Sequence, residues 1–282
     1  MEIKVLETAA GIGATECLSS PRPELSTNPL GLPIGCQTYP VRALIEKDFE
    51  GTLRVLVDAG FQEIELCSPV GYADCGFSGL AKYSGTDLEK IFGAIGVICN
   101  SSHFSIQELR DDLAGRIAWA EELGLTQIIV PTLAGPGDPT MDYVRRVADE
   151  FNKMGEHTAK AGIQLGLHNE DFELTTVDGR RTYDILFELL DANLVKFQFQ
   201  VSTISRGYDA AEYFTKYPGR FFSMHLQDWS ATAKTTVAAG QGDLDWKNIF
   251  SAARVGGIKN YFVELNLDAM KASVPYLRAL QV

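Results

Sequence analysis

The stretch Leu165–Gly166–Leu167–His168–Asn169–Glu170–Asp171–Phe172–Glu173 determines how the rest of the sequence is interpreted. It begins apolar, directly after a glycine typical of a helix end, Gly162, which indicates a buried strand. Within six residues it becomes polar and charged, and a strand leaving a core cannot bury such groups unpaired. Polar residues at the C-terminal end of a buried strand are typical of functional sites in α/β proteins. A charged surface loop after the strand is the alternative.

Similar short β-rich runs recur along the chain, with helical stretches between them. Asp112–Leu123 places its apolar residues on one face with the 3.6-residue period of an amphipathic helix, and Tyr143–Ala161 and Trp246–Val255 follow the same pattern. Five helices are predicted to end at a glycine that turns the chain into the next strand, namely Gly60, Gly96, Gly124, Gly162 and Gly257. The eight predicted strands are Ile34–Thr38, Glu63–Cys67, Val97–Asn100, Gln127–Val130, Ile163–Leu167, Val195–Phe199, Phe221–His225 and Tyr261–Glu264.

Eight β-then-α units over roughly 250 residues predict an α/β fold, a single (β/α)8 TIM barrel. A doubly wound sheet is the runner-up, but it would carry a glycine-rich phosphate loop after its first strand. The sequence has Gln37–Thr38–Tyr39–Pro40–Val41–Arg42 there instead. We expect the barrel to occupy residues 34–282. Residues 1–33 are rich in proline and serine without periodicity, and we interpret them as an irregular, loosely attached lead segment.

Composition narrows the class of protein. The formal net charge of −12 opposes binding to nucleic acid or to anionic membranes, since both need basic patches. No run of 18 apolar residues is present, so no membrane span is expected. Charged residues near Met1 stand where a signal peptide needs its apolar region, which favours the cytoplasm. The 5 cysteines form no Cys-x-x-Cys pair and are interpreted as reduced thiols.

In a barrel of this type, functional side chains lie at the C-terminal ends of the strands. Three of the chain's 4 histidines fall at such positions, and only His157 lies inside a predicted helix, which suggests one shared site. Glu264 follows an apolar strand, where a carboxylate needs a cation or a donor. Two carboxylates, an imidazole and an amide oxygen would suit a divalent cation such as Mn²⁺, Mg²⁺ or Co²⁺. The strand-end residues are Gln37, Glu65, His103, Thr132, His168, Glu170, Gln200, His225, Asp228 and Glu264.

Six motifs in order, from about Gly35 to Leu280, resemble the sugar phosphate isomerase/epimerase family of xylose isomerase-like barrels, a superfamily that includes endonuclease IV-type enzymes. The subgroup has a fifth strand reading Tyr-His-Asn-His-Asp-(Phe/Trp)-Glu. The motifs are Gly35–Cys36–Gln37–Thr38–Tyr39–Pro40–Val41–Arg42, Leu167–His168–Asn169–Glu170–Asp171–Phe172–Glu173, Lys216–Tyr217–Pro218–Gly219–Arg220, His225–Leu226–Gln227–Asp228, Gly240–Gln241–Gly242–Asp243–Leu244–Asp245–Trp246 and Val263–Glu264.

This resemblance implies a divalent metal held by four strand-end ligands, usually Glu, Asp, His and Glu. By position His225 matches the histidine and Glu264 the last glutamate, while Gln200 stands in place of the aspartate. The fifth-strand ligand stays open, and Glu170, which replaces the subgroup's second histidine, is our candidate for restoring the lost charge. Other charges of the pattern are also amides, because Gln227, Gln241 and Asn266 replace Lys, Glu and Asp. A neutral ligand at position 200 should weaken metal binding.

The predicted activity is that of an isomerase or epimerase, which moves a proton next to the carbonyl of a sugar or sugar-like molecule. The expected partner is a small carbohydrate, with no nucleic acid and no membrane, and a homo-oligomer is left open. Few cations lie near the strand ends, which favours an unphosphorylated substrate. The predicted catalytic residues are Glu170, Glu264 and His168, the substrate-binding residues Gln37, Glu65, His103 and Arg206, and the metal ligands Glu170, Gln200, His225 and Glu264.

Three alternatives stay open. β-Elimination from a 3-keto sugar, a lyase or deglycosidase-type reaction, needs the same carbanion. A sugar- or polyol-binding homologue with a degenerate metal site would explain the amides at Gln200, Gln227 and Gln241. Nuclease action on abasic DNA is more distant, because the acidic charge opposes binding to a phosphate backbone.

Overall fold

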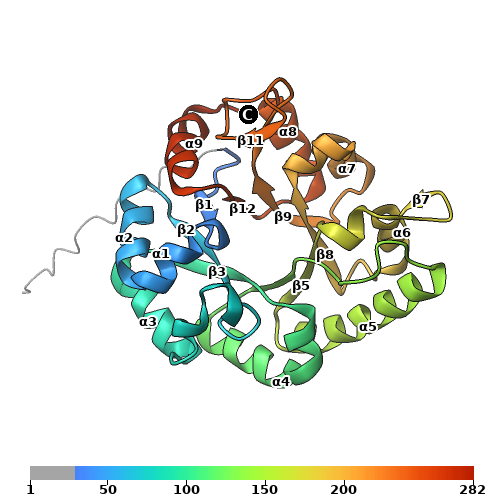
Figure 1. Cartoon of the computed structure of the whole chain (residues 1–282), viewed down its shortest axis with the longest axis horizontal. Coiled ribbons are helices and arrows are strands. Elements are labelled where there is room, and N and C mark those ends of the chain that lie inside the picture. Colours follow the sequence, from blue (N-terminus) through green and yellow to red (C-terminus); the bar gives the residue numbers. More distant parts are fainter. Residues whose placement is uncertain (1–28) are drawn as a thin grey trace, which may run out of the picture.

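The computed structural model describes residues 29–282, and the predicted lead segment lies almost wholly outside them. Eight parallel strands close into a barrel in the order β1-β12-β9-β8-β5-β4-β3-β2, which confirms the predicted (β/α)8 fold (Figure 1). Every predicted strand is present, although Glu264 lies one residue beyond the last. The strands are β1 (Gly35–Gln37), β2 (Glu63–Cys67), β3 (Ile98–His103), β4 (Gln127–Val130), β5 (Gln164–His168), β8 (Val195–Gln200), β9 (Phe221–Leu226) and β12 (Asn260–Val263).

Helices surround the barrel and cover its outer face (Figure 1). Each strand is buried on both faces, and its outward apolar residues pack under the helices to form one continuous core. The helices are α1 (Arg42–Lys47), α2 (Phe49–Ala59), α3 (Gly85–Ile95), α4 (Ile106–Leu123), α5 (Met141–Lys160), α6 (Thr182–Leu189), α7 (Ala210–Lys216), α8 (Trp246–Gly256) and α9 (Leu267–Ala279).

Local capping explains where the helices begin and end. All five predicted glycines have positive φ. Four of them are themselves the helix caps, whereas Gly162 follows Ala161, the residue that caps α5. The prediction that a helix starts at Asp112 was wrong, because Ser105 caps α4 through the Glu108 amide at 3.1 Å. Asp112 marks an interruption inside that helix, with φ of −152°. Asp245 caps α8 by accepting a hydrogen bond from the Asn248 amide.

Two short hairpins and five 3-10 helices fill the connections between strands and helices. The hairpin β10 (Asp228–Ser230) and β11 (Thr235–Val237) follows β9, and β6 (Thr176–Val177) pairs with β7 (Arg180–Arg181) after β5. The 3-10 helices are η1 (Tyr39–Val41), η2 (Ala73–Cys75), η3 (Ser78–Leu80), η4 (Asp171–Leu174) and η5 (Val201–Arg206).

The described end of the lead segment lies against the barrel. Leu30 and Leu32 pack partly buried on the core, and the Leu32 carbonyl accepts a hydrogen bond from the Tyr261 hydroxyl at 3.4 Å. Ordered packing therefore begins slightly before position 34. Among residues 29–282, the cysteines are free thiols, and none of the helices is long and apolar enough to cross a membrane.

Candidate active site

Polar side chains meet inside the barrel at the C-terminal ends of its strands. The alternation of a β-strand brings Glu65, His103, His168 and His225 inward from β2, β3, β5 and β9. One ring nitrogen of each histidine lies within 4.8 Å of the other two, and all three residues are buried. The three strand-end histidines therefore lie side by side, as their positions in the sequence predicted.

Glu65 is the centre of the network beneath these rings. Its Oε2 atom accepts from His225 Nε2 at 2.5 Å, Gln37 Nε2 at 2.9 Å and His103 Nε2 at 3.1 Å. Its Oε1 atom accepts from the Ser101 hydroxyl at 2.6 Å. Burial alone would raise the pKa of Glu65, but the neighbouring His103 and His225 outweigh it and hold the pKa well below its usual range. This carboxylate is completely buried, and its contacts with His103 and His225 hold the two rings in place.

Gln198 is a site residue that the sequence analysis missed. Its Nε2 atom donates to Glu65 Oε1 at 2.8 Å and to the Ser223 hydroxyl at 2.9 Å, while its Oε1 atom pairs with His103 Nε2 at 2.9 Å. The signal was present in the alternation Phe197–Gln198–Phe199–Gln200, in which both glutamines share the inward face. The amide of Gln198 is therefore committed to three partners.

His225 is clamped between two carboxylates. Its Nε2 atom faces Glu65, and its Nδ1 atom lies 3.1 Å from Glu264 Oε2. Burial would lower the pKa of this histidine, but Glu264 and Glu65 raise it to about 10. His225 is consequently an imidazolium at neutral pH in this arrangement, and its proximity holds the pKa of Glu264 below the usual value against the effect of burial.

Glu264 also accepts hydrogen bonds from two of the glutamines that replace charged residues of the family pattern. Gln200 Nε2 donates to Glu264 Oε2 at 2.6 Å, and Gln227 Nε2 donates to the same oxygen at 3.0 Å. The structure thus brings together three of the predicted metal ligands, Gln200, His225 and Glu264. The Oε1 atom of Gln200 is buried without a hydrogen-bond partner.

His168 is completely buried, yet neither of its ring nitrogens has a well-formed hydrogen-bond partner. The nearby Gln198 amide is already committed elsewhere. Burial, and then the charges of His225 and His103, hold the pKa of His168 well below its usual range, so the ring is neutral. An unpaired buried polar group costs roughly 1–3 kcal/mol, which a ligand at this position would offset.

Glu170 lies at the rim of the site. Its side chain is 45% exposed, and its Oε1 atom lies 3.8 Å from His168 Nε2. Partial burial and the nearby Glu264 raise its pKa above the usual value. Asp171 follows with a φ of +34°, a conformation that aspartate tolerates better than most residues, and the chain turns into η4.

The predicted substrate ligand Arg206 and the strand-end residue Asp228 lie outside the cluster. Arg206 is exposed at the end of η5 and makes no contact with the cluster among residues 29–282, so the structure does not place this predicted substrate ligand at the site. Asp228 is buried and has a structural role. It accepts from the backbone of Gly240 at 2.8 Å and from Trp246 Nε1 at 2.8 Å, thereby fixing the loop after β9.

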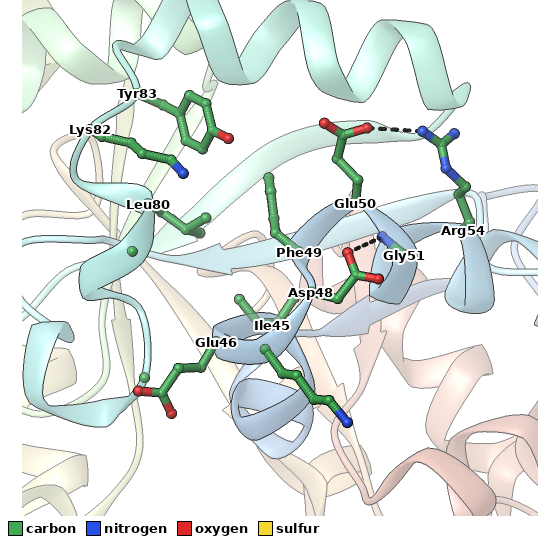
Figure 2. A pocket seen from close by; sticks show the side chains of 13 residues that line it. Ile45, Glu46, Asp48, Phe49, Glu50, Gly51, Arg54, Leu80, Lys82 and Tyr83 are labelled. Atoms are coloured by element: carbon green, nitrogen blue, oxygen red, sulfur yellow. Dashed lines mark hydrogen bonds and ion pairs between the residues drawn. The ribbon is translucent and has the colours of Figure 1, made fainter.

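A hollow of about 570 Å³ on the outside of the barrel is separate from this cluster (Figure 2). It lies between the α1–α2 segment and the residues around Leu80 and Tyr83. Among its charged groups, Glu50 pairs with Arg54 at 2.9 Å and Asp48 caps α2. None of its lining residues belongs to the histidine cluster, so we place the candidate active site at the strand ends.

The donor atoms at the strand ends fit a divalent cation. Unpartnered atoms of His168 and Gln200 lie buried there, and His225 Nδ1 and Glu264 Oε2 are separated by a distance suited to two ligands of one ion. Carbonyl oxygen, carboxylate and imidazole are all accepted ligand types. Glu170 stands at the edge of this set.

The family model for xylose isomerase-like TIM barrels matches residues 53–279, and the chain belongs to this family. No curated protein matches the chain. Among solved structures it is similar to a sugar phosphate isomerase/epimerase from Parabacteroides distasonis, with a TM-score of 0.74 and 24% identity over 88% of this chain and 96% of that one. It is also similar to the IolI protein with a bound zinc atom (TM-score 0.65, 14% identity, 88% and 94% covered) and to an L-ribulose 3-epimerase (0.58, 19%, 83% and 81%).

Proposed function

We propose that this protein is a metal-dependent isomerase or epimerase that moves a proton next to the carbonyl of a sugar or sugar-like substrate. The observation that carries the proposal is the position of two carboxylates around the buried histidines. Glu264 is hydrogen-bonded to His225, which also contacts Glu65, and Glu170 lies 3.8 Å from His168. Proton transfer at carbon needs at least one such group in reach of the substrate, and an epimerase uses two held in different protonation states. The family membership and the sugar isomerase and epimerase neighbours agree with this reaction class.

The residues that would hold the cation are His168, Gln200, His225 and Glu264, with Glu170 at the rim. When bound, a divalent cation supplies polarisation of the carbonyl and hydroxyl oxygens of the substrate, which acidifies the C–H bond between them. The buried Glu65 keeps the imidazoles of His103 and His225 in fixed orientations below.

Glu170 is the residue best placed to take the proton. Its carboxylate is the most accessible of the site, and its raised pKa brings it closer to the operating pH than an ordinary glutamate. Glu264 would return the proton from the opposite side. His168 is neutral and can orient a substrate hydroxyl. Two proton-transferring groups suit an epimerase, and one group shuttling between adjacent carbons suits an isomerase.

The charges around the site favour an unphosphorylated substrate. Arg42 is engaged with Tyr39, because its guanidinium lies 4.3 Å from the ring centre and donates to the Tyr39 carbonyl at 3.0 Å. Arg206 is exposed at the end of η5. Within the described part of the chain, the hydrogen-bond partners of the cluster include no lysine or arginine that could pair with a phosphate group.

The test is proton exchange in deuterated water. Unphosphorylated ketoses such as D-fructose and D-xylulose are incubated with the protein and Mn²⁺, Co²⁺ or Zn²⁺, and deuterium entering beside the carbonyl is followed by NMR. We expect exchange that falls at least about 100-fold in Glu170→Gln and that persists in the control Glu89→Gln, which changes an exposed residue of α3. Exchange unaffected by Glu170→Gln would refute the assigned role.

A binding function without turnover is the second candidate. The specific observation in its favour is that Gln200 and Gln227 both donate to Glu264 Oε2, which satisfies the carboxylate without a cation. In that case calorimetry would detect sugar binding while no metal supports exchange.

A further inference from the structure

We propose that His103, His168 and His225 form a three-imidazole site that selects zinc-type cations over manganese and magnesium. This inference rests on the proposed function only in requiring a cation at the strand ends. It adds His103 and His168, which the ligand set predicted from the sequence did not contain. It also replaces the expected preference for Mn²⁺, Mg²⁺ or Co²⁺ as a group by a preference for ions that favour nitrogen ligands.

The three rings come from different parts of the barrel and meet at one point. Their centroids are separated by 5.6 Å between His103 and His168, 4.6 Å between His168 and His225, and 5.2 Å between His103 and His225. One nitrogen of each ring lies within 4.8 Å of the others, so the three side chains can supply ligands to one ion.

The hydrogen bonds leave nitrogens available for such an ion. His103 and His225 both direct Nε2 at Glu65, which is the arrangement in which a ligating histidine donates its other N–H to a carboxylate. The second nitrogen of each ring is then the coordinating one, and in His225 this atom already lies beside Glu264. Neither nitrogen of His168 has a well-formed hydrogen-bond partner, and Glu170 Oε1 lies 3.8 Å from Nε2, so no hydrogen bond has to be broken for this ring to bind the ion.

The glutamine at position 200, which stands in place of a charged aspartate ligand, determines which ion this site favours. Gln200 contributes no negative charge, and Glu264 is the carboxylate in direct contact with the trio on its open side. A ligand set dominated by imidazole suits zinc, copper or nickel, whereas magnesium and manganese prefer sets rich in carboxylate and water oxygens. The sugar-facing position would be left to Glu170 and solvent.

The test measures metal binding rather than activity. Chelator-treated full-length protein is titrated with ZnCl2, MnCl2 and MgCl2 by calorimetry, and we expect zinc to bind at least 100-fold more tightly than manganese. His103→Gln should weaken zinc binding at least 10-fold and leave manganese binding almost unchanged. The matched control is His157→Gln, which replaces the remaining histidine on the exposed face of α5 and should change neither affinity.

Spectroscopy of the unmodified protein gives a second, independent readout. Loaded with Cu²⁺, it should show coupling to three imidazole nitrogens in pulsed electron paramagnetic resonance, and a count of two or fewer would overturn the proposal. Equal zinc and manganese affinities, or a zinc affinity unchanged in His103→Gln, would overturn it as well. Tight zinc binding without proton exchange would support this site while refuting the proposed function, and exchange supported by manganese with weak zinc binding would do the reverse.

Discussion

Replacing Glu173 by glutamine should make the protein more stable at neutral and alkaline pH while leaving it almost unchanged at pH 5. Glu173 is completely buried, its Oε1 atom accepts from the Leu133 amide at 2.8 Å, and its Oε2 atom has no well-formed partner among the described residues. Burial raises the pKa of this carboxyl to about 8 from the ordinary 4.5, against the lowering effect of the Leu133 hydrogen bond.

The sign and size of the effect follow from linkage. Below pH 4.5 the carboxyl is protonated in both the folded and the unfolded chain, and its contribution to stability is fully present. As the pH rises toward about 8 the unfolded chain ionises while the folded protein retains the proton, so stability falls by about 1.4 kcal/mol per pH unit. The difference of 8 and 4.5, or 3.5 units, sets an upper bound of about 5 kcal/mol, and the loss between pH 5 and 7 is about 3 kcal/mol.

Glutamine keeps an oxygen for the Leu133 amide but cannot ionise. Urea unfolding of both proteins at pH 5, 6, 7 and 8, followed by fluorescence, measures the difference in unfolding free energy, in which the titration of all other groups cancels. The difference should grow with pH in favour of Glu173→Gln, and Glu89→Gln on the exposed face of α3 should show no such growth. Parallel stability curves for the variant and the original protein would refute the reasoning.

Three further changes have defined outcomes. Gln200→Asp should tighten metal binding by calorimetry because it restores an anionic ligand, while the equally short but neutral Gln200→Asn should not. His168→Leu should raise the unfolding free energy of the metal-free protein by about 1 kcal/mol, because two buried nitrogens without hydrogen-bond partners disappear. The same change should abolish zinc binding, and an unchanged zinc affinity would contradict this. Gly166→Ala should lower the unfolding free energy by about 1–3 kcal/mol, because the added Cβ would lie 2.4 Å from Phe222 Cζ, and a neutral effect would show that this ring can move.

The fold could be predicted because its determinants are local. Apolar β-rich runs, helix periodicity and capping glycines each depend on a few neighbouring residues. The β-rich runs recur eight times along the chain, and five predicted helices end at a glycine. The errors were local as well. Asp112 resembles a helix start because it does accept from the Gly115 amide at 2.9 Å, but it does so inside α4 rather than at its beginning.

The site could be predicted only in part, because its interactions join distant strands. His225 and Glu264 were recognisable from their strand ends, whereas Gln198 was hidden between two phenylalanines and its partner Glu65 lies 133 residues away. The predicted substrate ligand Arg206 shows why distance along the chain does not fix a position in space. It follows a strand closely in sequence, but the 3-10 turn η5 carries it to the exposed surface.

The neutral side chain of Gln200 and the positive charge of His225 together determine the net charge of the buried network in the metal-free protein. Glu65, His225 and Glu264 carry two negative charges and one positive charge when the histidine is protonated, so the buried network has a net charge of −1. An additional buried aspartate at position 200 would raise this to −2 and would repel Glu264, to which the Gln200 amide now donates. Neutral glutamine therefore stabilises the metal-free network, and the same neutrality leaves selection of a cation to nitrogen ligands, since imidazole binds its preferred ions without a formal negative charge.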